Sequence, residues 1–430
     1  MSGITVSKKM VFPGTPGLGL GLSNDTYTDA DGKELIGVIG TSEAMTEQGA
    51  VGSGFETFRS SRGISNGLRR SRDNGLTWET EEPFWQLTPE TDDRVFGYIQ
   101  NSICGIVRDD AKGALIRFLD TRVNFGPVFF GGGSPTYRHN RIFYQVSRDC
   151  GVTWTAPHQL VCGGDRNDKG DKFYWLDYAP GVVWGETFVQ FDQPSIVHLE
   201  DGSFLLGAYR LVKDGKYRPC EAMAIRAQWK TGAEEDVLSF TFGAPISISP
   251  EQSPKGLPEP TFMKLRDGRL IAVLRSSGSE ENDTWSRRFY ALSEDDGSTW
   301  GPLKALLYDD GETIIVPESI SKLIRSSKTG KVYWIGNIID EPVRGCAPRN
   351  KIQIAEFDEK KLALVKDTVT IIDESPRGKG ERNFSNFVLY EDRFSHDIIV
   401  LMTPGFISGE WMSEGDIDVV NGYRYEVSVV

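Results

Sequence analysis

The sequence predicts an all-β fold, a six-bladed β-propeller, and three observations carry this prediction. An octad recurs three times, a second strand–turn–strand element recurs between its copies, and together they divide the chain into six units. Aromatic residues make up 11% of the chain and glycines number 47, which suits many short strands joined by tight turns. We expect residues 1–430 to form a single domain, because no Pro-rich or Ser-rich linker separates the units.

The octad occupies residues 71–78, 147–154 and 293–300, with Ser first, Asp third, Gly fifth and Thr-Trp at its end. The Asp carboxylate is suited to accept backbone N–H bonds inside a tight turn, and Gly supplies the positive φ that such a turn needs. The Trp ring is expected to pack into the core between neighbouring sheets. We therefore predict that each octad is a hairpin turn and that Asp73, Asp149 and Asp295 are structural residues.

The second element is clearest at residues 193–210 and 259–275, where a strand, an Asp-Gly hairpin and another strand follow one another. Weaker copies lie near 318–337 and 386–402. Adding the octad hairpin gives four antiparallel strands per unit, which is a propeller blade. The predicted units are 10–85, 93–162, 186–250, 256–310, 314–374 and 382–430.

The sequence leaves two features of the ring undecided, namely the number of blades and the blade in which the last strand pairs. Seven blades are the alternative to six, if the insertion around residues 126–134 contains further strands. The last strand, near residues 423–429, is expected to close the ring by pairing in the first or the last blade.

Composition excludes several classes of function. A formal charge of −13 argues against nucleic acid or an anionic membrane as a general partner, and no stretch of about 18 apolar residues predicts a membrane span. The five cysteines are odd in number and lack zinc spacing, so we expect neither a metal nor another cofactor. A reduced, cytoplasmic protein is the simplest expectation, or a secreted one if an export signal has been removed.

Candidate site residues follow from the blade geometry. The octad and Asp-Gly hairpins share one end of a blade, so the starts of inner and third strands and the ends of second strands lie at the other end. There they face the mouth of the central funnel, where propellers usually bind ligands. The charged, aromatic and histidine residues at this end include Asp192, Glu259, Glu318, Arg210, Arg275, Arg288, Arg349, Tyr137 and His139.

The three octads and these strand pairs resemble the Asp-box repeats of the sialidase superfamily over nearly the whole chain. The resemblance implies a sialidase-like propeller acting on carbohydrate. Arg275 resembles the family's second carboxylate-binding arginine, Arg349 resembles the third, and Glu259 matches the glutamate that assists a tyrosine nucleophile. The first arginine has no clean counterpart. The tyrosine position is occupied by Phe384, which has no hydroxyl and cannot attack a sugar.

Three functions remain open at this stage. Glu259 and Glu318 begin adjacent inner strands and are suited to act as the two carboxylates of a glycoside hydrolase, about 5 Å apart for retention and further for inversion. A polysaccharide lyase acting on a uronic-acid glycan would use His139 as its base, beside Tyr137. A non-catalytic glycan-binding propeller is the third reading, supported by the missing tyrosine.

The reading we favour is an exo-acting glycoside hydrolase whose substrate is an acidic sugar or glycan. In it, Arg275 and Arg349 hold the sugar carboxylate, Glu259 is the general acid or base, and Glu318 or His139 is the partner group. Four further residues are expected to contact the substrate: Arg210, Asp192, Arg288 and Tyr137.

Overall fold

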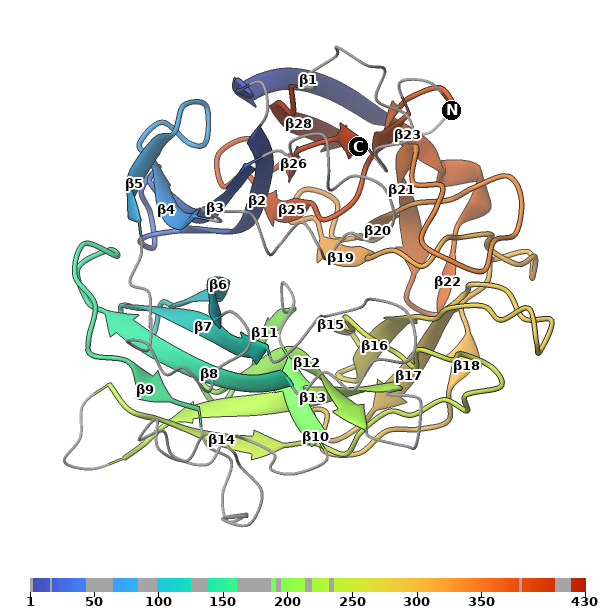
Figure 1. The fold of residues 1–430 in the computed structure, drawn as a ribbon, viewed down its shortest axis with the longest axis horizontal. Coiled ribbons are helices and arrows are strands. Elements are labelled where there is room, and N and C mark those ends of the chain that lie inside the picture. The colour runs from blue at the N-terminus through green and yellow to red at the C-terminus, as the bar shows by residue number, and fades with distance from the viewer. Residues whose placement is uncertain are drawn as a thin grey trace.

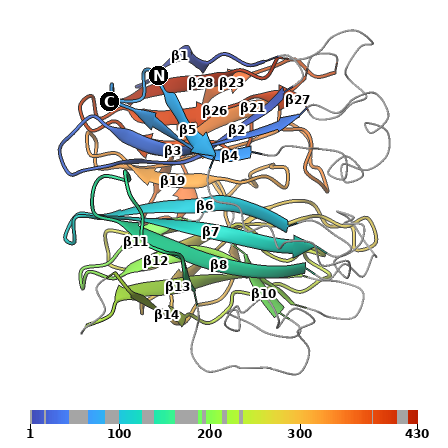
Figure 2. The ribbon, with the colours of Figure 1, turned by 60° about the vertical axis from the view of Figure 1, so that its left-hand side comes forward.

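The computed structural model describes residues 3–15, 18–43, 65–83, 99–124, 138–160, 187–190, 195–212, 219–231, 236–378, 381–406 and 419–430. Within these ranges six antiparallel sheets of four or five strands surround a common axis (Figure 1), and Figure 2 shows the same ribbon turned by 60°. The arrangement is a six-bladed β-propeller, which confirms the predicted fold class. The insertion around residues 126–134, on which a seventh blade would depend, lies outside the described residues.

The first three blades come from the N-terminal half of the chain. From the axis outward, the first blade contains β2 (Leu18–Tyr27), β3 (Leu35–Glu43), β4 (Ser65–Ser71) and β5 (Glu79–Pro83). The second contains β6 (Ile99–Asp109), β7 (Ala114–Asn124), β8 (Arg138–Ser147) and β9 (His158–Gln159). In the third, β10 (Thr187–Gln190) and β11 (Ile196–His198) both pair with β12 (Phe204–Val212), followed by β13 (Cys220–Trp229) and β14 (Leu238–Phe242).

The remaining blades follow in chain order. The fourth contains β15 (Thr261–Lys264), β16 (Leu270–Arg275), β17 (Arg288–Ser293) and β18 (Lys304–Ala305). The fifth contains β19 (Lys322–Arg325), β20 (Val332–Gly336), β21 (Lys351–Asp358), β22 (Ala363–Leu364) and β23 (Thr370–Glu374), with the 3₁₀ turn η3 (Lys366–Thr368). The sixth contains β25 (Val388–Glu391), β26 (Ile398–Met402), β28 (Gly422–Val429) and β1 (Ile4–Phe12), and β24 (Arg382–Asn383) pairs with β27 (Gly405–Phe406) beside it.

Apolar packing between neighbouring blades holds the ring together. Among the described residues the buried side chains form six clusters, and each cluster joins two adjacent blades. Between the fifth and sixth blades, for example, Ile354 packs with Val400 and Phe387. Strand alternation explains this pattern, because successive residues of a strand point to opposite faces and both faces of a blade are covered by its neighbours.

Each octad forms the turn between the third and fourth strands of its blade. In the second copy, Asp149 Oδ1 accepts the backbone N–H of Thr153 at 2.8 Å, and Asp149 Oδ2 accepts the Thr153 hydroxyl at 2.6 Å. Gly151 has φ of +81°, and its carbonyl accepts the indole N–H of Trp154 at 3.1 Å. Asp73 and Asp295 make the same pair of bonds to the threonines of their own octads. Both oxygens of each of these carboxylates therefore accept hydrogen bonds within their own turn.

Both ends of the described chain belong to the last blade. β28 is its third strand, and β1 pairs antiparallel with β28 as its outermost strand, from Ile4 opposite Val429 to Phe12 opposite Gly422. Residues 4–12 thus complete the sixth blade, whereas the unit limits predicted from the sequence began the first blade at residue 10 and left residues 4–9 outside every unit. Closing the ring in this way joins the N-terminal strand to the C-terminal sheet by hydrogen bonds.

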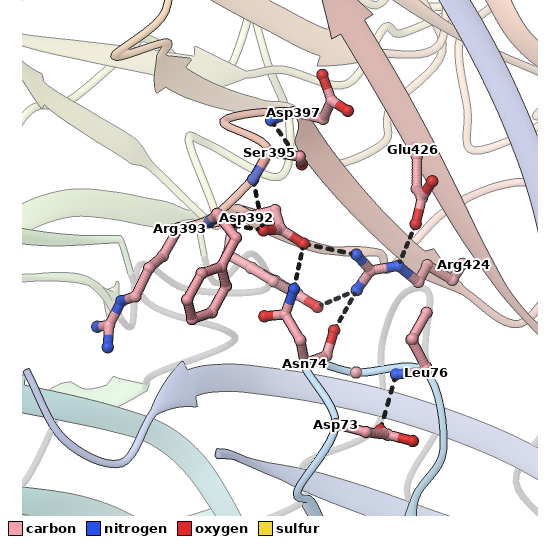
Figure 3. A network of polar contacts seen from close by, with 12 residues as sticks. Asp73, Asn74, Leu76, Asp392, Arg393, Ser395, Asp397, Arg424 and Glu426 are labelled. Atoms are coloured by element: carbon pink, nitrogen blue, oxygen red, sulfur yellow. Dashed lines mark hydrogen bonds and ion pairs between the residues drawn. The ribbon is translucent and has the colours of Figure 1, made fainter. Parts of the chain in front are cut away.

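A polar latch secures the junction between the sixth and first blades (Figure 3). Arg424 of β28 donates to Asp392 Oδ2 at 2.9 Å and to the carbonyl of Asn74 at 3.0 Å, and Asn74 Nδ2 donates to the same Asp392 oxygen at 2.6 Å. Asp392 also accepts backbone N–H groups from Phe394 and Ser395. The latch therefore lies at the octad end of the propeller.

The described residues contain no helix long and apolar enough to cross a membrane.

Candidate functional site

The fourth and fifth blades place charged residues at the end away from the octads. In the fourth blade, Glu259 lies just before β15, Arg275 ends β16, and Arg288 begins β17 directly opposite Arg275. β17 runs from Arg288 to Ser293, where the octad starts, so these residues and the octad lie at opposite ends of the blade. In the fifth blade, Glu318 precedes β19 and Arg349 precedes β21, at the corresponding end.

Two carboxylates share one guanidinium at this end. Arg275 Nη1 forms an ion pair with Glu259 Oε2, and Arg275 Nη2 lies 3.8 Å from Glu318 Oε1. The side chains are sheltered, with exposed fractions of 16% for Glu259 and 2% for Glu318. Burial acts to lower the pKa of Arg275, but the two negative charges outweigh it, and the pKa is raised. Both acids therefore face a common point next to Arg275.

The backbone at Glu259 is held in an unusual conformation. Its φ is +53°, in the left-handed region that residues with a Cβ seldom adopt. It stands between Pro258 and Pro260, both of which have restricted φ. Such a conformation costs free energy of order 1–3 kcal/mol and is typically found where a side chain must be aimed at a site. Asn386, at the start of the sixth inner strand, has a similar φ of +57°.

Arg349 connects the fifth blade to the sixth. Its Nη2 donates to the Glu318 carbonyl at 2.6 Å, and its Nη1 donates to Ser385 Oγ at 3.2 Å. Burial lowers the pKa of Arg349. This guanidinium holds the backbone of one acidic residue and reaches toward the start of the sixth inner strand.

Arg288 lies beneath the cluster and is almost completely buried, at 1% exposure. Its guanidinium donates to the carbonyls of Pro317 at 3.2 Å and Ser319 at 2.6 Å, the two residues that flank Glu318. Burial lowers its pKa to about 9, and the positive charges of Arg275 and Arg349 add to this effect. Arg288 therefore supports the Glu318 segment from below, in place of the open position at the mouth expected from sequence.

Lys255 and Cys346 also contact Glu318, and the sequence pattern had not selected either residue. Lys255 Nζ lies 2.8 Å from Glu318 Oε2, and Cys346 Sγ lies 3.6 Å from the same oxygen. Lys255 comes from the connection between the third and fourth blades, where no repeat marks it. Cys346 precedes the Ala-Pro-Arg349 sequence, and this proximity is the only signal that points to it.

The cluster carries an excess of positive charge. Lys255, Arg275, Arg288 and Arg349 stand against Glu259 and Glu318, although the whole chain has a formal charge of −13. A group of cations held in a sheltered site is stabilised when an anion binds among them. The arrangement therefore suits a ligand that carries a carboxylate.

Of the remaining predicted residues, only Arg210 has a side chain in the described part of the structure. Arg210 forms an ion pair with Glu221 across β12 and β13, at 2.6 Å. Asp192 and Tyr137 lie outside the described residues. The backbone of His139 pairs with Val123 in the second blade, but its side chain lies outside the described part of the structure. The lyase hypothesis depends on Tyr137 and His139 and therefore stays a prediction.

Phe384 belongs to the apolar core between the fifth and sixth blades, with 3% exposure. Its backbone N–H donates to the Arg349 carbonyl at 2.8 Å, so its main chain is next to the cluster while its ring is packed in the core.

Within the described residues, no three His, Cys, Asp or Glu side chains gather as a metal site would require.

Comparison with known proteins relates the chain to propeller enzymes by structure alone. No protein-family model matches the sequence, and the curated proteins searched contain no match. An α-L-arabinanase of Penicillium chrysogenum, complexed with arabinobiose, is similar with a TM-score of 0.51 at 14% identity, covering 99% of this chain and 98% of the other.

Two further solved structures show the same relationship. The GH93 α-L-arabinofuranosidase of Fusarium graminearum has a TM-score of 0.51 at 12% identity, over 98% of this chain and 97% of that one. The intramolecular trans-sialidase of Ruminococcus gnavus has a TM-score of 0.53 at 12% identity, over 94% of each chain. At these identities the likeness shows the fold. The chain has the fold of the sialidase-like six-bladed propellers, a fold shared by several glycoside hydrolases.

Proposed function

We propose that this protein is an exo-acting glycoside hydrolase that removes an acidic sugar from a glycan. The observation that supports the proposal is the pair of sheltered carboxylates, Glu259 and Glu318, which contact one guanidinium at the end of the blades away from the octads. Two carboxyl groups flanking a glycosidic bond are the usual requirement of glycoside hydrolysis. The similar solved structures, which include an arabinanase and a trans-sialidase, support the same reaction class.

In the proposed mechanism, the cationic groups bind the acidic sugar first. Arg275, Arg349 and Lys255 surround the position where the sugar carboxylate would lie, and a guanidinium binds a carboxylate through two hydrogen bonds. Lys255 has a side chain that is 54% exposed, so it can move toward an arriving anion. Binding there orients the anomeric carbon toward the two glutamates.

The two glutamates then divide the chemistry. Glu259 acts as the general acid that protonates the leaving oxygen. Glu318, held by Lys255 and Arg275, is the carboxylate that attacks the anomeric carbon or activates water. Phe384 cannot serve as a nucleophile because it has no hydroxyl, so the proposal assigns this role to a carboxylate.

A glycan screen tests the proposal. Purified protein is incubated with sialylated, uronic-acid and arabinose-containing oligosaccharides, and products are identified by mass spectrometry and NMR. The proposal predicts a free acidic monosaccharide, whose anomeric form in early NMR spectra distinguishes retention from inversion. An unsaturated product absorbing in the ultraviolet would identify a lyase instead. Affinity without turnover would identify a binding module.

A double variant tests the residue assignment. Glu259→Gln combined with Arg275→Ala removes the acid and its shared cation. Turnover of the acidic glycan at the wild-type rate by this variant would refute the assignment of both residues, even if hydrolysis itself had been demonstrated.

A further inference from the structure

A pocket lies on the fifth blade, at the same end as the candidate site. Its volume is about 860 Å³, within the range typical of small-ligand sites. It is formed by the connection that follows β20, by the start of β21 and by the segment that follows β23. None of the residues assigned above to the hydrolytic site lines it.

One short segment separates this pocket from the hydrolytic site. Pro348 and Asn350 line the pocket, whereas the guanidinium of Arg349, between them in sequence, donates to Glu318 and Ser385. Successive residues of this extended segment thus serve two different sites. The pocket and the hydrolytic site are therefore adjacent along this segment of the chain.

The wall of the pocket is already ordered by polar contacts. Lys351 Nζ lies 3.0 Å from Asp340 Oδ2. Asn350 Nδ2 donates to the Ser375 carbonyl at 3.0 Å, and the Ser375 N–H donates back to the Asn350 carbonyl at 2.9 Å. The two sides of the pocket are therefore joined by hydrogen bonds, which lowers the entropy that a ligand would lose in ordering them.

The chemistry of the lining differs from that of the hydrolytic site. Three carboxylates, of Asp340, Glu341 and Glu374, stand with two cations, Lys351 and Arg377, so neither sign dominates. Carboxylates and guanidinium groups accept from and donate to hydroxyl groups. Apolar surface suited to the C–H face of a sugar ring comes from Ile339, Val343, Pro348 and Pro376. Such a lining fits an uncharged polyhydroxyl ligand better than an anion.

We infer that this pocket is a second carbohydrate site that binds a neutral sugar residue of the glycan. The assignment of that sugar to the substrate depends on the proposed function: the acidic terminal sugar occupies the cationic site, and a neutral sugar on the leaving-group side occupies the pocket. The protein would then select glycans in which an acidic end is attached to a neutral chain.

Binding of neutral disaccharides tests this inference without requiring turnover. Lactose, arabinobiose and xylobiose are titrated by calorimetry into the wild type, into Arg275→Ala and into the double variant Glu341→Ala/Arg377→Ala. Glu294→Ala is the matched control, because Glu294 is an exposed residue in an octad at the opposite end. We expect at least one disaccharide to bind the wild type, Arg275→Ala and Glu294→Ala equally. The double variant should bind it at least about fivefold more weakly, the loss of one or two hydrogen bonds.

Three outcomes would overturn the inference: equal affinity in the double variant, loss of affinity in Arg275→Ala, or absence of binding to the wild type up to about 10 mM of each sugar. Failure of the proposed function can be told apart from failure of this inference, because it would appear as absence of turnover in the glycan screen. If turnover is found, the double variant should raise KM for an oligosaccharide and leave KM for an aryl glycoside of the same acidic sugar unchanged.

Discussion

The two ends of the propeller use the same charged residue types in opposite ways. At the octad end, the carboxylates of Asp149 and Asp392 accept backbone N–H groups of their own turns, and Arg424 is bonded to Asp392 and Asn74. At the other end, Glu259 and Glu318 contact side-chain cations, one of which is a half-exposed lysine. Acids that accept backbone N–H groups of their own turns stabilise the fold, whereas acids that contact side-chain cations at a sheltered site are suited to chemistry.

The difference also separates repeated from unrepeated residues. The octad aspartates recur at one place in each of three blades because the same turn is built three times. Glu318, by contrast, is contacted by two residues that belong to no repeat, Lys255 and Cys346. The octad repeat thus marks structural acids, whereas Lys255 and Cys346, which complete the candidate site, lie outside both repeated elements. The following variants test this division.

The largest effect is expected from the glutamate at the centre of the cluster. Glu318→Gln keeps the size of the side chain but removes its charge, so hydrolysis should fall on the order of 10²–10⁴-fold. The midpoint of thermal unfolding serves as the control for folding. If Glu318→Gln retained more than a tenth of wild-type kcat, the residue would belong with the structural acids of the other end.

Thiol reagents should distinguish two cysteines close to the cluster. Cys346 is exposed and touches Glu318, so its alkylation by iodoacetamide should reduce activity more than about tenfold by blocking the site. Cys220 is buried, and burial raises its pKa to about 12, so it should not react. Peptide mass spectrometry locates the label. Cys150→Ser, in an octad at the far end, should stay as sensitive as the wild type, whereas inactivation of Cys346→Ser would contradict the prediction.

Phe384→Tyr introduces the hydroxyl that the resemblance to sialidases predicts for this position. Because the ring is 3% exposed in the core between two blades, the added hydroxyl should not reach the substrate. We expect activity within about twofold of the wild type and a loss of about 1–3 kcal/mol in the free energy of unfolding. A large gain in turnover would show that the ring can turn toward the site.

The smallest effect concerns an octad. Hydrogen bonds from Thr153, and then from Ser147, lower the pKa of Asp149 to about 2, against an ordinary value of 3.8. The stabilisation is therefore complete above pH 3.8 and is lost as pH falls toward 2. Asp149→Asn should unfold a few degrees below the wild type at pH 6, and the difference should shrink as pH falls. Activity of the folded variant should be unchanged, and a difference that grew at low pH would contradict this assignment.

Much of the architecture is readable from the sequence because it repeats. The octads and strand pairs predict six blades, and the strand ends predict that Glu259, Arg275, Glu318 and Arg349 share one end, where the structure brings them together. The direction of a strand does not determine where its side chains point. Arg288 lies beneath the backbone next to Glu318, whereas Arg275 faces the Glu318 carboxylate, and the sequence pattern could not distinguish the two positions. Lys255 was missed because it lies in a connection without periodicity, and the pocket of the fifth blade was missed because three separate segments form it.

The outer position of β1 in the sixth blade has a consequence for biosynthesis. β1 is among the first segments of this chain to leave the ribosome, yet its partner β28 is made only after the other five blades. Until then, its backbone donors and acceptors remain exposed to any other unpaired strand edge. Newly made chains are therefore most exposed to misassembly before β28 is made, while the ring is still open.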